Sequence, residues 1–384
     1  GLDYVLRFAR RASNQVLKML AQLPPCVPPT NIELDSPGSR ITAEDFEKAI
    51  DAGVFHSIGE FMDFESVVGA DPQAVRKIVC AYSRGMAIYG HIPTGDEILL
   101  NAYTAAPISS CHESTSAEEV VEKLRRGMWV MLRYATTWKD AEYVLPELIR
   151  QCIDLSRVML VSDDILVTDL VEQGHMDRAV KSMVELGVDP IKVLKMVTLN
   201  PATYLRLDNL VGIIAPGRLA DIVLLESLDS VKVDTVFVEG FTVYRKGEIL
   251  IESAQTSTET PLESLFNPPT IKSPRDLVID IDGEAEEIGI VTAEIVKKTP
   301  LTRKRIDAAT AINSTLALPD DTVYVSVIDR YRGESIGKGF AKGIELSSGA
   351  IAQTIGHDTH NIVVVGKTPV SYTHLRAHET VLDL

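Results

Sequence analysis

The chain is short of cysteines, of basic residues and of long apolar runs, and each shortage excludes a class of protein. Its four cysteines, Cys26, Cys80, Cys111 and Cys152, form no CxxC pair, which disfavours a disulfide scaffold and indicates a reducing compartment. No apolar run reaches the roughly 20 residues of a membrane-spanning helix. A formal net charge of −16 would repel nucleic acid and anionic lipid. We therefore expect a cytoplasmic protein that binds neither nucleic acid nor a membrane.

Short apolar runs alternate with helix-like segments between Val54 and Asp164. The helix-like segments carry apolar residues at three- and four-residue steps, and Ser116 with Glu119 predicts a capping box at the start of one of them. Such alternation predicts parallel strands joined by helical crossovers, an α/β fold. Because the units follow one another without a switch, we expect a TIM barrel rather than a doubly wound sheet.

Each of five successive runs ends in a polar residue, and these are Glu60, His91, His112, Arg133 and Asp163. The carboxyl ends of parallel strands meet at one edge of the sheet, so these side chains are expected to converge. Imidazoles and carboxylates suit zinc, manganese or ferrous iron, and two such metals can share a bridging hydroxide. One histidine or carboxylate at a strand end is more often structural. Four in register favour a metal-dependent hydrolase or lyase.

Several longer motifs occur in this order along the chain: PPCVPPTNIE, YGHIP, SSCHESTSAEEVVEKLRRGMWVMLR, VSDD and GAIAQTIGHDTHNIVVVG. In order and spacing they resemble the adenine deaminases of the amidohydrolase superfamily. The resemblance, from Gly1 to about Lys367, implies a distorted TIM barrel and hydrolysis of adenine to hypoxanthine and ammonia in purine salvage. It implies a hydroxide activated by a binuclear divalent centre, Mn²⁺ or Fe²⁺. Because barrels of this kind often pair, we also expect a homodimer.

The resemblance assigns the metal ligands and the proton shuttle. Glu60 would bridge the two metals, and His91 and His112 would bind them from the next two strands. Asp163 would be both a metal ligand and the catalytic proton shuttle. Glu113 is a second catalytic candidate, as the donor of a proton to the purine ring. It follows His112 directly, so only a bend at the strand end would bring it to the pocket, and it could equally be a first-turn carboxylate of the next helix.

Three further residues are candidates for substrate binding. Glu33 lies in the PPCVPPTNIE loop and could also protonate the ring or be a solvated loop residue. Arg133 could position the substrate or pair with a carboxylate inside the barrel mouth. His175 could line the pocket or only begin a helix. The dense cluster from His357 to Asn361 could bind a metal, but we interpret it as a hydrogen-bonded turn or an inter-domain contact.

The domain plan follows from these patterns. We expect the TIM barrel, without its first strands, in residues 1–205 and the barrel end with small β-sandwich strands in residues 206–252. A linker rich in Ser, Thr and Pro follows in 253–274, and an α+β adenine deaminase C-terminal domain in 275–369. Residues 370–384 resemble a translated adapter sequence, and we exclude them from fold reasoning.

The sequence departs from the family pattern at its start. The family's first strand ends in a His-x-His pair that completes the metal site, and no such pair precedes Leu2. We therefore expect the chain as it stands to be inactive and marginally folded, with unpaired strand edges. Cys111 stands where relatives often carry Asp, and Tyr134 to Thr136 where many carry Glu-Gly-Ser, which bears on purine specificity.

Two other interpretations remain open. Another amidohydrolase, acting on a modified purine or a cyclic amide, would share the metal ligands and differ in loops such as Pro25–Glu33. A non-catalytic homologue used for assembly would usually have lost metal ligands, and here every ligand in the covered region is present.

Overall fold

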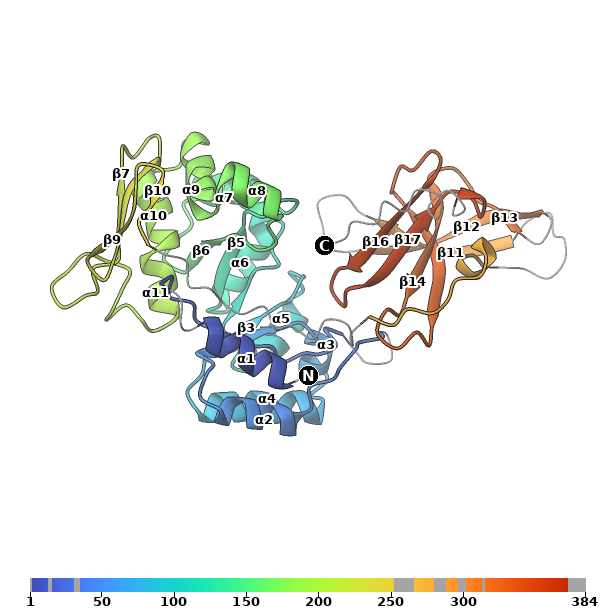
Figure 1. Cartoon of the computed structure of the whole chain (residues 1–384), viewed down its shortest axis with the longest axis horizontal. Coiled ribbons are helices and arrows are strands. Elements are labelled where there is room, and N and C mark those ends of the chain that lie inside the picture. Colours follow the sequence, from blue (N-terminus) through green and yellow to red (C-terminus); the bar gives the residue numbers. More distant parts are fainter. Residues whose placement is uncertain are drawn as a thin grey trace. The chain divides into compact units, whose positions relative to one another are not determined.

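The computed structural model describes residues 2–12, 16–30, 35–251, 266–279, 288–295, 302–312 and 315–371. By its contacts the chain divides into two units (Figure 1). The first unit comprises Gly1–Cys26 and Ile41–Ser257, and the second comprises Val27–Arg40 and Thr258–Leu384. Most of the expected linker, up to residue 265, and the expected tail after residue 371 lie outside the described residues.

The first unit alternates strands and helices, as the sequence pattern predicts. Its parallel part consists of α1 (Leu2–Ala12), β1 (Gln22–Leu23), α2 (Ala43–Asp51), β2 (Ser57–Phe61), α3 (Phe64–Val68), α4 (Pro72–Ser83), β3 (Ile88–Gly90), α5 (Glu97–Ala105), β4 (Ser110–Cys111), α6 (Ala117–Arg125), β5 (Trp129–Arg133), α7 (Asp140–Arg150) and β6 (Val158–Val161). The strands pair in parallel in chain order, as the sheets β1-β2-β3 and β4-β5-β6. The Ser109 N–H donates to Ile88 O at 3.1 Å and continues the pairing from one sheet to the next.

The expected α/β class is confirmed, but the described strands do not form a closed barrel. Within the described ranges β1 pairs only with β2, and β6 only with β5. Closing a barrel of the TIM type takes eight strands, and the two three-stranded sheets fall short of that number. An incomplete barrel therefore stays a prediction.

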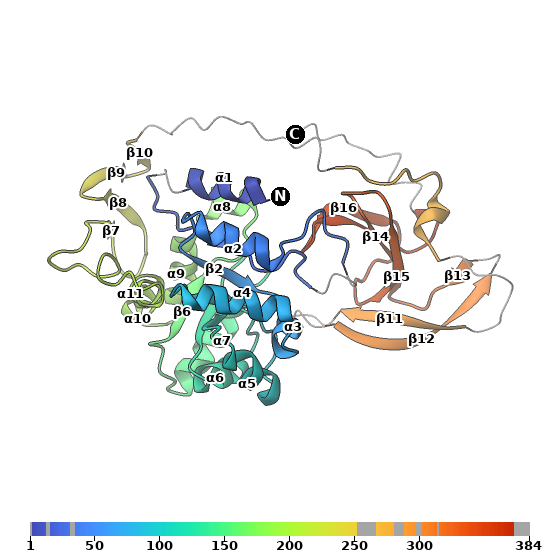
Figure 2. The same ribbon diagram turned by 90° about the horizontal axis from the view of Figure 1, so that it is seen from below.

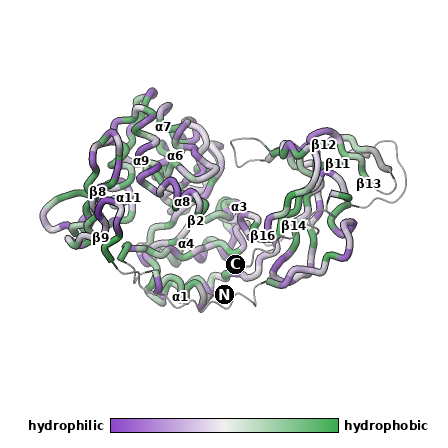
Figure 3. Tube along the Cα trace, turned by 45° about the horizontal axis from the view of Figure 1, so that its top comes forward, coloured by the Kyte–Doolittle hydropathy of each residue, from purple (hydrophilic) through white to green (hydrophobic). Residues whose placement is uncertain are grey.

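The helices pack on the sheets through apolar faces. Helices α7, α9 and α10 flank β5 and β6 (Figure 1), over a core that includes Val130, Leu132, Val144 and Met183. Figure 3 shows hydrophobic and hydrophilic segments alternating along α6, α7 and α9, as expected of amphipathic helices. Helices α2 and α4 lie side by side (Figure 2).

The helix starts follow the local sequence. Thr42 and Asp45 form a reciprocal capping box on α2. Ser116 caps α6 by accepting from the Glu119 N–H, as expected, while the Glu119 carboxylate accepts from the Thr115 N–H instead. Helix α4 begins with an Asp cap followed by Pro. These caps fix where α2, α4 and α6 start, and so where the loops before these helices end.

The first unit ends with helices and a small antiparallel sheet. These elements are α8 (Val167–Gln173), α9 (Met176–Glu185), α10 (Pro190–Val197), α11 (Leu199–Tyr204), β7 (Ile222–Leu225), β8 (Val233–Val238), β9 (Phe241–Arg245) and β10 (Glu248–Ile249). The sheet has the order β10-β9-β8-β7. Among the described helices of the whole chain, none has the length and apolar character needed to span a bilayer.

The second unit is β-rich in its described residues, not α+β as expected. It contains one short 3-10 helix, η2 (Pro274–Leu277), and a sheet with the order β13-β12-β11-β15-β14-β17-β16. The strands are β11 (Ile288–Ile295), β12 (Thr302–Ile312), β13 (Thr315–Ala317), β14 (Thr322–Ile328), β15 (Ile336–Lys342), β16 (Ala350–Gly356) and β17 (Asn361–Gly366). Tyr324 and Val364 lie in its core. Branched apolar side chains alternate with other residues along β14 and are consecutive from Ile362 to Val365 in β17, and their enrichment favours strands over helices.

Candidate metal centre

Three expected ligands lie at the carboxyl ends of neighbouring strands. Glu60 is the penultimate residue of β2, His91 follows β3 directly, and His112 follows β4 directly. Close approach of β3 to β4 depends on Gly90, because a Cβ at this position would overlap Ser110 O. The glycine thus allows the two histidine rings to lie 5.3 Å apart between centroids.

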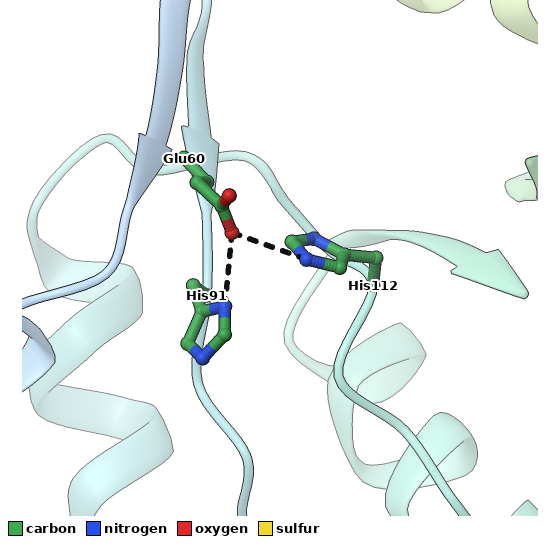
Figure 4. Close-up of side chains that lie close together, drawn as sticks. All are labelled: Glu60, His91 and His112. Atoms are coloured by element: carbon green, nitrogen blue, oxygen red, sulfur yellow. Dashed lines mark hydrogen bonds and ion pairs between the residues drawn. The ribbon is translucent and has the colours of Figure 1, made fainter. Parts of the chain in front are cut away.

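A single carboxylate oxygen joins the two rings. Glu60 Oε2 lies 2.9 Å from His91 Nδ1 and 3.1 Å from His112 Nε2 (Figure 4). The ligand atoms of all three residues lie within 4.8 Å of one another. One carboxylate oxygen and two imidazole nitrogens at this spacing suit a divalent transition metal, so the donor set fits the metal expected from the sequence.

The contacts of Glu60 with the two histidines shift the pKa values of Glu60 and His112. Burial lowers the pKa of His112, but the hydrogen bond and the charge of Glu60 outweigh burial and raise it to about 9. Burial also raises the pKa of Glu60, but hydrogen bonds from His112 and His91 outweigh it and hold that pKa well below its usual value. Without a metal, a proton on His112 therefore supplies the positive charge that the carboxylate attracts.

A second group of possible ligands shares His112. It contains His112, Glu113 and Asp163, again with ligand atoms within 4.8 Å. The side chain of Glu113 is only 5% exposed, and its Oε1 lies 3.5 Å from His112 Nε2. The chain therefore bends after β4, as required for Glu113 to reach the same edge as His112. Asp163 has a φ of 56°, a left-handed conformation that Asp tolerates better than most residues.

Arg133, at the end of β5, lies among carboxylates. Its Nη1 donates to Glu113 Oε1 at 2.5 Å and its Nε to Asp140 Oδ2 at 2.7 Å, while Nε lies 3.5 Å from Asp163 Oδ2. The guanidinium lies 5.2 Å from the centre of the Trp138 ring. The sequence interpretation missed Asp140, and its place as the first residue of α7, soon after a strand end, is the signal that could have found it.

The Arg133–Glu113 pair is incompletely satisfied. Burial lowers the pKa of Arg133, but the charges of Glu113 and Asp140 outweigh burial and raise it. Among the described residues, Glu113 Oε2 and Arg133 Nη2 are buried without a hydrogen-bond partner. Such atoms normally find a partner, so one acceptor, Glu113 Oε2, and one donor, Arg133 Nη2, stay unsatisfied at this edge.

Two buried side chains position the strand ends. The Tyr103 hydroxyl accepts from the His91 N–H at 2.9 Å and donates to Phe61 O at 2.8 Å, which ties β3 to β2. Cys111 Sγ accepts from the Glu113 N–H at 3.3 Å. The Cys111 thiol thus supports the bend after β4.

Lys123 on α6 also stabilises the bend after β4. Its side chain is fully buried, and Nζ donates to Glu113 O at 2.5 Å and to Ser114 Oγ at 2.9 Å. A buried ammonium is costly unless its donors are used. The sequence pattern marked this helix only as amphipathic and gave no role to Lys123.

The remaining candidates that the structure describes do not join the cluster. His175 is exposed just before α9, and its backbone N–H donates to the Asp177 carboxylate. Glu33 lies outside the described residues. His357 and His360 lie in the turn between β16 and β17 of the second unit, with ring centres 6.4 Å apart, and within the described ranges they belong to no group with metal-ligand spacing.

Known protein families match most of the chain. Residues 2–243 match the Amidohydrolase family, the class of protein that a parallel α/β sheet with this donor set at its carboxyl edge defines. Residues 291–378 match the family described as Adenine deaminase C-terminal domain.

Individual relatives narrow the class. An adenine deaminase of Staphylothermus marinus is 39% identical over 372 residues, which cover 94% of this chain and 61% of that protein. One of Archaeoglobus fulgidus is 36% identical over 373 residues, which cover 95% of this chain and 60% of that protein. The chain belongs to the adenine deaminase family of the amidohydrolase superfamily. It spans about three-fifths of the length of these relatives.

Proposed function

We propose that the protein to which this chain belongs is an adenine deaminase, which hydrolyses adenine to hypoxanthine and ammonia. The observation that carries the proposal is the contact of one Glu60 oxygen with both His91 and His112. It occurs in a chain whose matched relatives are named adenine deaminase. Because the chain spans only part of those relatives, the activity is proposed for the whole protein.

Glu60, His91 and His112 would hold a divalent metal, and Asp163 is proposed as a further ligand. The proposed centre is binuclear and contains Mn²⁺ or Fe²⁺, which accept these ligand types. A metal bound here would lower the pKa of a water molecule towards neutrality and so supply a nucleophile.

The chain's own carboxylates would move the protons. The water oxygen bonds to C6 of the purine and the bond from C6 to the exocyclic nitrogen breaks, so the departing amine must gain a proton. Asp163 takes that proton from the attacking water and passes it on. Glu113 takes the second proton of the water and gives it to the neighbouring ring nitrogen, and its unpartnered Oε2 is the oxygen we assign to this transfer.

Arg133 would act through Glu113. Its Nη1 and Nε are already engaged by Glu113 and Asp140, which favours a positioning role over direct substrate binding. Glu33 and His175 remain candidates for substrate contacts, and a homodimer in the cytoplasm remains a prediction.

The test is ammonia release from adenine in the presence of Mn²⁺. It uses the chain extended to the length of its relatives, with an Asp163→Asn variant as control. We expect release by the unchanged protein and a loss of at least about 100-fold in the variant, as for removal of a general base. If the metal-loaded protein does not hydrolyse adenine but hydrolyses a modified purine or a cyclic amide, the protein is another amidohydrolase. A protein that binds no metal and releases no ammonia would support the non-catalytic interpretation.

A further inference from the structure

The backbone that follows Asp163 is held by the loop after the neighbouring strand β5. Asp163 adopts a φ of 56°, and a left-handed backbone at a residue other than glycine persists only where surrounding contacts hold it. Thr136 supplies two such contacts. Its N–H donates to Asp164 O at 3.0 Å, and its hydroxyl accepts from the Leu166 N–H at 3.0 Å. Thr136 thus fixes the chain at two points shortly after Asp163.

The Thr136 hydroxyl is itself oriented by a carboxylate on α8. It donates to Asp169 Oδ2 at 2.7 Å. Because a hydroxyl has a single hydrogen, this bond leaves the lone pairs of the oxygen for the Leu166 N–H. The other oxygen of Asp169 accepts from Gln173 Nε2 at 3.0 Å, so the carboxylate is held from its own helix as well.

Arg178 on α9 closes this arrangement. Its Nη1 donates to Asp169 Oδ2 at 3.5 Å. Its Nη2 donates to Tyr134 O at 3.3 Å and to Ala135 O at 3.2 Å, the two carbonyls directly before Thr136. The Arg178 side chain is only 8% exposed, and burying a guanidinium is costly unless its donors are used. One buried cation therefore joins the loop after β5 to α8.

We propose that this arrangement positions Asp163 for proton transfer by fixing the backbone that follows it. We call Thr136, Asp169 and Arg178 the Thr136 clasp. They are positioning residues, since their contacts reach the backbone after Asp163 and leave its carboxylate facing Arg133 Nε, 3.5 Å away. The consequence for catalysis rests on the proposed function, but the clasp itself does not.

Amide hydrogen exchange at Leu166 measures the clasp directly on the chain as it stands. Thr136→Val removes the hydroxyl that accepts from the Leu166 N–H and keeps the size of the side chain. Exchange of this amide should become about tenfold faster, because loss of the hydrogen bond raises the population of the locally open state. Asp169→Asn replaces the charged acceptor of the hydroxyl by a weaker one and should speed exchange several-fold.

The controls separate the clasp from general instability. Thr136→Ser keeps the hydroxyl and should restore the exchange rate of the unchanged chain. Thr203→Val removes an exposed hydroxyl that donates to Leu199 O on its own helix, so it should leave the Leu166 rate unchanged. The Tyr134 N–H donates to Val161 O at 2.8 Å, and its exchange should stay slow in every variant.

Two outcomes would overturn the clasp. One is Leu166 exchange as slow in Thr136→Val and Asp169→Asn as in the unchanged chain. The other is exchange of the Tyr134 N–H that speeds up as much as that of Leu166, because the effect would then not be local to the segment after Asp163.

A kinetic measurement tests the consequence for catalysis. In the chain extended to the length of its relatives, Thr136→Val should lower kcat for adenine about tenfold with KM nearly unchanged at saturating Mn²⁺, and Thr136→Ser should recover it. In an Asp163→Asn background Thr136→Val should add little, because the group that it positions is already disabled.

The failure of each part can be told from the failure of the others. Faster Leu166 exchange with an unchanged kcat would overturn the catalytic part of the proposal. If the unchanged protein releases no ammonia from adenine, the proposed function fails, while the exchange rates still decide whether the Thr136 clasp holds the segment after Asp163.

Discussion

Arg133 and Glu113 form a hydrogen-bonded ion pair of 2.5 Å between side chains that are only 4% and 5% exposed. Asp140 takes the other side of the same guanidinium at 2.7 Å. One buried cation thus lies between two buried carboxylates at the metal edge. Buried charges are tolerated only while every partner is present. We therefore expect both the stability of the fold and the catalytic rate to depend on Arg133.

Replacing Arg133 by Met should strongly destabilise the chain. The change leaves Glu113 and Asp140 buried without their cation, which costs about 3–5 kcal/mol of unfolding free energy when a buried pair is broken. Urea denaturation followed by circular dichroism measures this loss. The matched control is Arg150→Met, because Arg150 is 73% exposed and pairs with Glu147 on its own helix, so it should show almost no change. Equal losses in both variants would contradict the prediction.

Kinetics should show whether Arg133 acts through Glu113. In the extended protein, Arg133→Lys keeps the charge but loses the planar two-sided geometry, so kcat should fall about tenfold or more with KM nearly unchanged. In a Glu113→Gln background the same change should add little, because the group that Arg133 positions is already disabled. Binding of an unreactive purine, followed by calorimetry, should be equal in Arg133→Lys and the unchanged protein. A raised KM, weaker purine binding and additive losses would instead place Arg133 on the substrate.

The sequence predicted the strand-end residues better than their partners. Glu60, His91 and His112 could be predicted because parallel strands bring their carboxyl ends to one edge, which follows from periodicity alone. Asp140 and Lys123 could not, since their contacts depend on how a helix packs on the neighbouring strand. A helix pattern shows which face is apolar but not which buried charge it carries.

Closure of the barrel likewise could not be predicted from local sequence patterns. Strand and helix alternation predicted the parallel sheets, yet whether sheets close depends on strand number and not on any local pattern. Strict alternation of side chains along a strand would place Glu113 on the face opposite to His112, and the bend after β4 brings it to the same edge. The bend depends on the ending of β4 at Cys111 and on contacts from Cys111 and Lys123 that no local pattern reveals.

Metal affinity should rise with pH. Burial lowers the pKa of His112, and the hydrogen bond and charge of Glu60 outweigh it and raise the pKa to about 9. Below that pH a metal must displace the proton, so Mn²⁺ should bind more tightly from neutral pH towards 9 and release a proton. Titration calorimetry in buffers of different ionisation enthalpy measures both effects. Glu60→Gln should weaken binding at least about tenfold, while His175→Ala should match the unchanged chain. Affinity that does not vary with pH would refute this account.

The metal-free chain should show the opposite pH trend in stability. The folded pKa of His112, about 9, exceeds its ordinary value of 6.5. Its contribution is therefore complete below pH 6.5 and is lost as the pH rises through about 9. Urea midpoints measured in a chelating buffer should fall across this window, and Glu60→Gln should flatten the fall. A midpoint that stays constant or rises across the window would mean that the Glu60–His112 contact is absent in the metal-free state.

Lys123 should matter through the backbone of Glu113 and not through its own charge. Lys123→Met keeps the length of the stem but leaves Glu113 O and Ser114 Oγ without their donor, which should cost about 1–3 kcal/mol of unfolding free energy. The bend after β4 would then hold Glu113 less firmly, so kcat in the extended protein should fall while Mn²⁺ affinity stays nearly constant, because the metal ligands keep their contacts. Lys181→Met is the matched control, since Lys181 is 55% exposed on α9. A variant as stable and as active as that control would show that the bend is held by Cys111 and the Arg133 pair alone.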